Sequence, residues 1–157
     1  MVRKTRGDLL KFDAGILCHQ VNYFGVMGGG IAASIYDKAL DSDSRKLYER
    51  FCYNRGTKAL GKVQFLPHVD RKRWICNLFC QDDFTPQSDG GITSYDHMLK
   101  CLSQVEMYAR KAKLSVAIPG YMGCGIAGGD WDRVEAIIHK VFDKSPVLCT
   151  IVYWVKE

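Results

Sequence analysis

The stretch from Pro119 to Trp131 reads PGYMGCGIAGGDW and places five glycines between an apolar run and a helix-like segment. A second glycine-rich stretch, NYFGVMGGGIA, runs from Asn22 to Ala32. Nine of the fifteen glycines of the chain fall in these two stretches. Each follows an apolar, strand-like run and precedes a segment in which apolar residues recur at helical spacing. They therefore predict two strand–loop–helix units of the same construction.

Loops of this construction can hold an anion. Glycine lets backbone N–H groups turn toward a ligand and approach it closely. The N-terminus of the following helix adds unpaired donors and a partial positive charge. Ligands of an open α/β sheet bind outside the carboxyl ends of its strands, so both loops should meet at one edge. A tight turn would explain one such loop, whereas two favour a ligand with two neighbouring phosphates.

Three familiar phosphate-binding motifs do not fit the sequence. Residues 123–128 match the dinucleotide pattern G-x-G-x-x-G, but that motif opens its fold, and only one helix and one strand are expected after it here. Residues 25–30 have the glycine spacing of a P-loop, yet Ile31 and Ala32 stand where it needs Lys and Ser or Thr. No cysteine is followed six positions later by arginine, as a cysteine phosphatase loop requires.

Strand-like and helix-like patterns alternate along the chain. Strands are expected at 15–21, 62–66, 73–80, 114–118 and 147–155, and helices from Gly30, at 43–55, at 93–112 and from Asp130. A short polar turn joins 62–66 to 73–80 and predicts a hairpin. The run 147–155 is so continuously apolar that it predicts a central strand covered on both faces. The pattern predicts an α/β fold, a three-layer α/β/α sandwich with a mixed, mostly parallel central sheet.

The composition predicts a single domain over residues 1–157. The chain is 47% hydrophobic and 25% charged with a formal charge of +5, and its basic residues fall in short groups typical of a solvated surface. The start lacks the apolar stretch of a secretory signal and no apolar run suits a membrane span, so we predict a cytoplasmic protein. The seven cysteines have no metal-ligand spacing and are expected to be reduced and buried, with no metal site.

With Gly7-Asp8-Leu9-Leu10 ahead of them, the two glycine loops resemble the macro domain family of ADP-ribose-binding proteins. The resemblance covers nearly the whole chain. The Gly-Gly-Gly-Ile-Ala and Ala-Gly-Gly-Asp-Trp forms of the loops, and His19 three residues before Asn22, look most like the bacterial, phage and yeast proteins related to ADP-ribose-1″-phosphate phosphatase. The resemblance implies ADP-ribose or ADP-ribosylated molecules as partners, no cofactor, and no nucleic acid except through ADP-ribosylated ends.

The resemblance also implies roles for single residues. Asp8 would accept a hydrogen bond from the adenine amino group, with Leu9 beside it, and Asn22 would hold the distal ribose. The other contacts fall on the loops: Gly28, Gly29, Gly30 and Ile31 at the distal ribose and phosphate, and Met122, Gly123, Cys124, Gly125, Ile126 and Ala127 around the diphosphate. Tyr153 or Trp154 would pack on the adenine, with Tyr153 assigned first, because alternation lets only one of them face the site. Asp130 is expected to cap the last helix instead of meeting the ligand.

Two functions stay open at this point. One is a hydrolase that removes phosphate, or an ester-linked acyl group or protein carboxylate, from the 1″ position of ADP-ribose. The other is a reader that binds ADP-ribose and catalyses nothing. For hydrolysis, His19 is the predicted general acid/base because its pKa lies in the right range, and Asn22 is predicted to orient the ribose.

Two further acidic residues, Asp82 and Asp83, follow the strand at 73–80 and could also reach the ribose, although solvated loop carboxylates are the simpler interpretation. A lysine-adduct mechanism does not fit. The branch that resembles terminal ADP-ribose glycohydrolase has a lysine and an aspartate where Gln81 and Ala127 stand in this chain.

Overall fold

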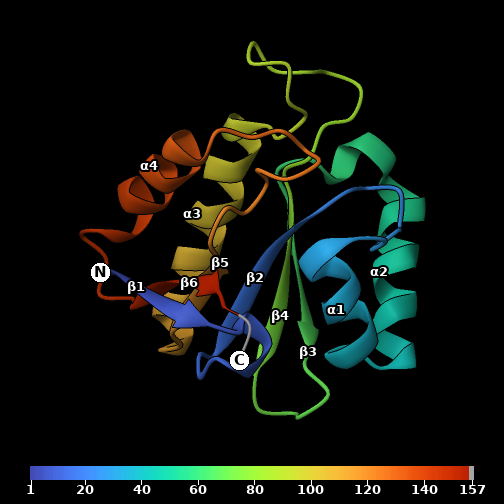
Figure 1. Ribbon diagram of the computed structural model, residues 1–157. Coiled ribbons are helices and arrows are strands. Elements are labelled where there is room, and N and C mark those ends of the chain that lie inside the picture. Colours follow the sequence, from blue (N-terminus) through green and yellow to red (C-terminus); the bar gives the residue numbers. More distant parts are fainter. Residues whose placement is uncertain (156–157) are drawn as a thin grey trace.

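The computed structural model describes residues 1–155, which form a six-stranded sheet with helices on both faces (Figure 1). The strands are β1 (Val2–Gly7), β2 (Ile16–Val21), β3 (Val63–Pro67), β4 (Trp74–Phe79), β5 (Val116–Pro119) and β6 (Cys149–Trp154). The helices are α1 (Gly30–Lys38), α2 (Ser42–Arg55), α3 (Tyr95–Ala112) and α4 (Trp131–Phe142), with short 3-10 turns at Leu9–Lys11 and Gly56–Ala59. The strand order is β1-β6-β5-β2-β4-β3, and every neighbouring pair is parallel except β3–β4.

Different helices cover the two faces of the sheet, α1 and α2 on one side and α3 and α4 on the other (Figure 1). Successive residues of a strand point to opposite faces. Leu17 of β2 therefore packs in the core that contains Ile35 of α1, whereas Cys18 packs in the core that contains Met98 of α3 and Val134 of α4. The predicted three-layer sandwich with a mixed, mostly parallel sheet is confirmed.

The sequence patterns do not predict β1. Its residues, VRKTRG, include three exposed cations, which is unusual for a strand inside a sheet. The structure explains them, because β1 lies at the edge, pairs only with β6, and leaves Arg3, Lys4 and Arg6 in solvent. Charged side chains on an edge strand also discourage pairing with other chains. The predicted interior position of the last strand is confirmed, since β6 lies between β1 and β5.

The predicted hairpin and the predicted cap of the last helix are both confirmed. β3 and β4 pair antiparallel, with Val63 opposite Leu78. A carboxylate oxygen of Asp130 accepts a hydrogen bond from the N–H of Asp132 at 2.9 Å, which caps α4. Ser94 caps α3 in the same way, so this helix begins two residues later than the predicted Thr93.

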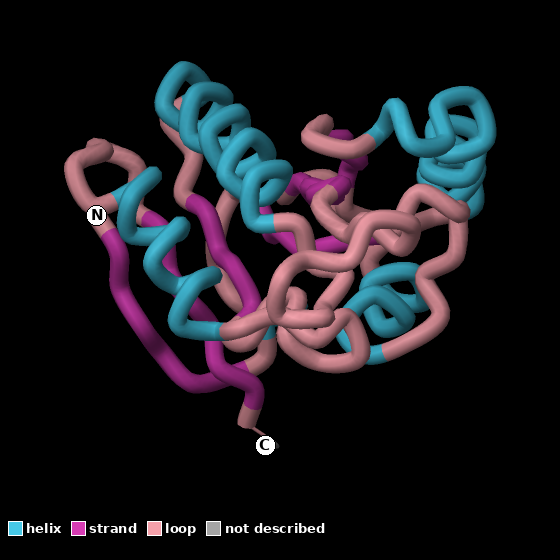
Figure 2. The backbone as a smooth tube through the Cα atoms, turned by 90° about the horizontal axis from the view of Figure 1, so that it is seen from above, coloured by secondary structure: helices cyan, strands magenta, loops and turns pink. Residues whose placement is uncertain are grey.

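The carboxyl ends of the parallel strands meet at one edge of the sheet. There β2 and β5 are neighbours, and the chain leaves them toward opposite faces, to α1 after β2 and to α4 after β5. Neighbouring strands with diverging connections leave a crevice between them, which is where open α/β sheets bind ligands. Figure 2 looks down on this edge and shows the loops gathered between the helical layers. Within residues 1–155, no helix combines the length and apolar character that a membrane crossing needs.

Candidate functional site

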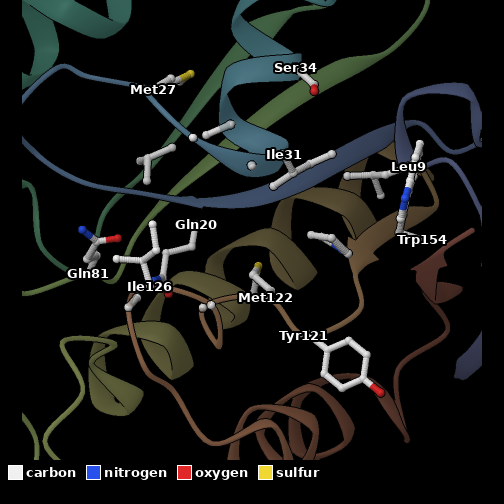
Figure 3. A pocket seen from close by; sticks show the side chains of 18 of the residues that line it. Leu9, Gln20, Met27, Ile31, Ser34, Gln81, Tyr121, Met122, Ile126 and Trp154 are labelled. Atoms are coloured by element: carbon white, nitrogen blue, oxygen red, sulfur yellow. The ribbon is translucent and has the colours of Figure 1, made fainter. Parts of the chain in front are cut away.

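A cavity of about 830 Å³ lies at this edge, over the carboxyl ends of β2 and β5. Both glycine loops line it: the first glycine loop (residues 22–30) follows β2, and the second glycine loop (residues 120–129) follows β5. Figure 3 shows Leu9 and Trp154 at one end of the cavity and Gln20, Gln81 and Ile126 at the other. We call these the Trp154 end and the Gln81 end.

The first glycine loop leads into α1, and the N-terminus of this helix has no side-chain cap and lies at the wall of the cavity. α1 begins at Gly30, and Gly29 before it has no side chain that could cap the first turn. The first N–H groups of a helix have no partner within the helix. They carry the positive end of the helix dipole, which favours an anion. Gly28, Gly29, Gly30 and Ile31 all line the cavity, so these donors lie at its wall.

The second glycine loop offers donors of a different kind. Gly125, Ile126 and Ala127 line the cavity, and within the described chain their N–H groups have no hydrogen-bond partner. They do not belong to a helix, because α4 begins only at Trp131 and is capped by Asp130. The expectation that both loops present a helix N-terminus is therefore wrong for the second one. Its donors come from the irregular backbone between the end of β5 and the start of α4.

The side chain of Asn22 fixes the shape of the first glycine loop. Its Nδ2 donates to the carbonyl oxygen of Val26 at 2.8 Å, and its Oδ1 accepts from the N–H of Phe24 at 3.0 Å. The hydroxyl of Tyr48, on α2, donates to the backbone oxygen of Asn22 at 3.0 Å. Asn22 lines the cavity while it holds this turn, so its side chain combines a structural contact with access to a ligand.

A hydrogen-bond chain fixes the second glycine loop to the sheet. Gln20 on β2 donates through Nε2 to Oγ1 of Thr93 at 3.0 Å, and that hydroxyl donates to the carbonyl oxygen of Gly123 at 2.6 Å. The N–H of Ile92 donates to the oxygen of Ala127 at 2.8 Å. The loop before α3 and the second glycine loop are thus joined by hydrogen bonds at two points. These bonds limit how far the two loops can move relative to each other.

Most of the residues predicted from sequence gather around this one cavity. They are Asp8, Leu9, Asn22, Gly28, Gly29, Gly30, Ile31, Met122, Gly123, Gly125, Ile126 and Ala127. The side chain of Asp8 also accepts a hydrogen bond from the N–H of Leu10 at 2.9 Å and so caps the short turn after β1. That these residues contact a ligand stays a prediction.

Three predicted residues do not line the cavity, and Tyr153 is one of them. Its hydroxyl donates to Glu135 of α4 at 3.2 Å, and its ring contacts Tyr121 and Trp131 on that face of the sheet. Because side chains alternate along β6, Trp154 points to the other face and lines the cavity. Of the two predicted aromatic residues, Trp154 and not Tyr153 therefore lines the cavity, and contact of Trp154 with adenine stays a prediction. Cys124 also points away, since its thiol contacts the oxygen of Met122 and packs against the core below.

The acid–base role predicted for His19 does not agree with its position. His19 is completely buried within the sheet, on the face covered by α1 and α2, and does not line the cavity. Its Nε2 lies 2.6 Å from Oδ1 of Asn77, whose Nδ2 donates to Gln64 at 3.1 Å. Burial lowers the pKa of His19 from 6.5 to about 4, with the Asn77 hydrogen bond opposing that shift in part. We therefore assign His19 a structural role as a neutral donor.

The two acidic residues after β4 are engaged within their own loop and do not line the cavity. Asp82 is buried, and one of its carboxylate oxygens accepts from the N–H groups of Phe84 and Thr85 at 3.2 Å each. Asp83 accepts from Nε2 of Gln81 at 2.9 Å. Both carboxylates shape the turn, which differs from the solvated role expected for them.

Several cavity residues carry no motif and were missed from sequence. They include Gln20, Gln81, Ser34 and Lys38. Period-two alternation along β2 could have indicated Gln20, because the buried side chains on either side of it point to the opposite face. Ser34 and Lys38 follow Ile31 at helical spacing, so one exposed stripe of α1 faces the cavity.

The buried position of His19 predicts a specific loss of stability in acid. The unfolded chain protonates this imidazole near pH 6.5, whereas the folded chain does so only near pH 4. As the pH falls from 7 to 5 the unfolded state binds the extra proton, so the free energy of unfolding should fall by about 2 kcal/mol from this group. Urea unfolding at the two pH values measures the loss.

The matched variant is His19→Gln, because a glutamine amide can also donate to Asn77. Other groups, including His68 with its lowered pKa, titrate equally in both proteins. The difference between the two proteins therefore isolates His19. An equal loss of stability in wild type and variant would show that His19 is not the buried neutral group described here.

Comparisons with known proteins find relatives of low sequence identity, and two of them have names that refer to ADP-ribose derivatives. No protein-family model matches the chain. A DNA ADP-ribosyl glycohydrolase of Mycobacterium tuberculosis is 28% identical over 98% of this chain but only 42% of its own length. An ADP-ribose 1″-phosphate phosphatase of Lodderomyces elongisporus is 28% identical over 89% of this chain and 92% of its own. The chain thus spans less than half of the mycobacterial relative and nearly all of the phosphatase.

Among solved structures, the macrodomain of Mycobacterium tuberculosis DarG is similar over almost its full length. The TM-score is 0.80 at 26% identity, and the alignment covers 99% of each chain.

Proposed function

Because this chain belongs to the macro domain family, we propose that it binds ADP-ribose in the cavity and hydrolyses a bond at the 1″ position of the distal ribose. The observation that carries the proposal is the pair of glycine loops, each with unpaired backbone N–H groups at the wall of one cavity. Two sets of N–H donors, in the loops that follow the neighbouring strands β2 and β5, suit the two phosphates of a diphosphate. The names of the two relatives support hydrolysis of an ADP-ribose derivative.

The polarity of the cavity fits the other parts of ADP-ribose. The Trp154 end combines the apolar Leu9 and Val152 with the carboxylate of Asp8, which suits an adenine ring and its amino group. The Gln81 end presents side-chain amides, from Gln20, Gln81 and Asn22 nearby, which suit the hydroxyl groups of a ribose. The ligand would therefore lie with its adenine over β6 and its distal ribose between the two loops.

Hydrolysis would depend on orientation and polarity more than on an acid–base side chain. Among the described residues that line the cavity, only Asp8 and Lys38 carry a charge. Asp8 belongs to the Trp154 end, and Lys38 lies at the last turn of α1, about 12 Å along the helix from Gly30. Water at the distal ribose would be oriented by the amide of Asn22, and the loop N–H groups would stabilise negative charge on the phosphates.

The same observation favours a second candidate, a reader without catalysis. Among the described residues, no titratable side chain lines the Gln81 end, and the contacts proposed for this cavity account for binding without turnover. The two candidates differ in one measurable property, release of the group attached at the 1″ position.

The test is phosphate release from ADP-ribose-1″-phosphate without added metal. We expect turnover by the wild type and at least a tenfold lower rate for Asn22→Ala, because this change removes the amide and its contact to Val26. The matched control is Asn54→Ala, an exposed asparagine of α2, which should keep the wild-type rate. Tight ADP-ribose binding with no release from this substrate, or from ADP-ribosylated carboxylates and nucleic acid, would leave the reader in place of the hydrolase.

A further inference from the structure

One side of α1 presents two polar side chains to the cavity that the proposed binding of ADP-ribose does not use. Ser34 and Lys38 follow Ile31 at helical spacing, and all three residues line the cavity. Within residues 1–155, neither the hydroxyl of Ser34 nor the ammonium of Lys38 has a hydrogen-bond or ion-pair partner. Among the described residues that line the cavity, Lys38 is the only cation. We call Ser34 and Lys38 the α1 pair.

The α1 pair lies toward the Trp154 end of the cavity. Figure 3 shows Ser34 on the same side as Leu9 and Trp154, with Gln81 on the opposite side. At a rise of 1.5 Å per residue, Ser34 lies about 6 Å and Lys38 about 12 Å along the helix from its first residue. Side chains of a helix lean toward its N-terminus, so the ammonium of Lys38 can reach back beside Ser34.

The charge of this wall does not match the adenosine part of ADP-ribose. The negative charges of ADP-ribose lie on its diphosphate, for which the two glycine loops supply N–H donors. The adenosine, which would lie toward Trp154, is neutral. Asp8, the one acidic residue among the described residues that line the cavity, does not pair with Lys38. An unpaired cation and a hydroxyl beside the neutral part of the ligand therefore favour a ligand with a further anionic group there.

The position of Lys38 in the last turn of a helix does not account for this arrangement. A cation there interacts favourably with the helix dipole, and Lys140 has the same position in α4. Lys140, however, does not line the cavity, whereas Lys38 does so together with a hydroxyl one turn away. The two lysines thus share the effect on the helix and differ in access to the ligand.

We infer that the α1 pair binds a phosphomonoester on the adenosine ribose, so that the preferred ligand is ADP-ribose with a phosphate at its 2′ or 3′ hydroxyl. This ribose joins the adenine to the diphosphate and would therefore lie along α1, between Gly30 and Lys38. The ammonium of Lys38 would pair with the phosphate, and the hydroxyl of Ser34 would donate to it. The inference deepens the proposed function and takes the orientation of the ligand from it.

The 2′-phosphorylated form is the ADP-ribose part of NADP. Dinucleotide-binding proteins that accept NADP place a basic side chain at this phosphate, because a neutral or acidic wall would leave its charge unpaired. The α1 pair supplies such a side chain on the wall that the adenosine ribose would face. The class of reaction that would supply this ligand is transfer or cleavage of the ADP-ribose part of a phosphorylated nicotinamide dinucleotide.

The experiment compares AMP with adenosine 2′,5′-bisphosphate and adenosine 3′,5′-bisphosphate by isothermal titration calorimetry. One bisphosphate should bind the wild type at least about tenfold more tightly than AMP, since it adds an ion pair to the contacts of AMP. This ratio should fall at least about fivefold in Lys38→Gln, and it should fall in the wild type as salt rises, because salt screens an exposed pair. If the 2′ position is the one recognised, 2′-phospho-ADP-ribose should exceed ADP-ribose by a similar factor.

The matched control is Lys140→Gln, which removes the same charge from the last turn of α4 and should keep the wild-type ratio. Equal affinity of the wild type for AMP and both bisphosphates would overturn the inference, and so would an equal loss of the ratio in the two glutamine variants. ADP-ribose is titrated in parallel. Tight binding of ADP-ribose without a gain from either added phosphate would overturn the inference alone. A gain that depends on Lys38, without binding of ADP-ribose, would instead overturn the proposed function.

Discussion

Replacing Gly125 by glutamate should abolish ADP-ribose binding and leave the stability of the protein nearly unchanged. The N–H groups of Gly125 and the two residues after it point to no partner within the described chain, so they are free for the diphosphate. A Cβ at Gly125 would meet no atom within 4 Å, and its φ lies outside the left-handed region, so the change strains nothing. A carboxylate about 4 Å from a phosphate costs about 4 kcal/mol near a protein surface.

That repulsion corresponds to a loss of affinity of about a thousandfold. Isothermal titration calorimetry with ADP-ribose, AMP and NAD is the measurement, and ADP-ribose should bind the wild type most tightly. Ala136→Glu is the matched control, since it adds the same charge at an exposed position of α4. Affinity for ADP-ribose that survives in Gly125→Glu would show that the second glycine loop does not hold the diphosphate.

The glycine loops could be predicted from sequence because glycine content, flanking apolar runs and chain order are all local properties. The same local patterns predicted the hairpin and the layers. What they could not predict is how a residue is placed by elements far along the chain. β1 was missed because its charges are compatible with a strand only at an edge, and edge position is a property of the whole sheet.

The two corrected assignments fail for related reasons. Tyr153 and Trp154 are neighbours on one strand, and sequence alone does not say which face α4 covers. His19 precedes the first glycine loop by a few residues, which suggests proximity to the ligand, but alternation along β2 sends its side chain into the core beside Asn77. In both cases the register of a strand, set by its neighbours, decides the role of the residue.

The glycines of the second loop differ in what they do, although the sequence shows them as one cluster. Gly125 has open space around its Cβ position, and its role in the proposal is to hold the ligand. Gly123, two residues earlier, has a φ of +75° and lies against Gln20 and Thr93. The chain from Gln20 through Thr93 to the oxygen of Gly123 ties the loop to β2. Gly123 is therefore needed for the position of the loop. Gly125 instead leaves the exposed side of the loop free of a side chain.

This difference predicts that Gly123→Ala destabilises the protein, whereas Gly125→Ala does not. A Cβ at Gly123 would lie 2.8 Å from Oε1 of Gln20 and 2.9 Å from Oγ1 of Thr93, so the hydrogen-bonded pair must move. The left-handed backbone adds roughly 1–2 kcal/mol for a residue with a side chain. With about 1 kcal/mol for a disturbed hydrogen bond, the free energy of unfolding should fall by about 2–3 kcal/mol.

Urea unfolding of the three proteins measures this prediction, and calorimetry with ADP-ribose completes it. Gly123→Ala should lower both the unfolding midpoint and the affinity, because the loop it displaces carries the donors of Gly125 and the residues that follow. Gly125→Ala should unfold like the wild type, since its Cβ would meet no atom within 4 Å. Equal unfolding midpoints for the two alanine variants would contradict the stabilising role of the hydrogen-bond chain from Gln20 to Gly123. An unchanged affinity in Gly123→Ala would show that this chain does not position the backbone proposed to bind the ligand.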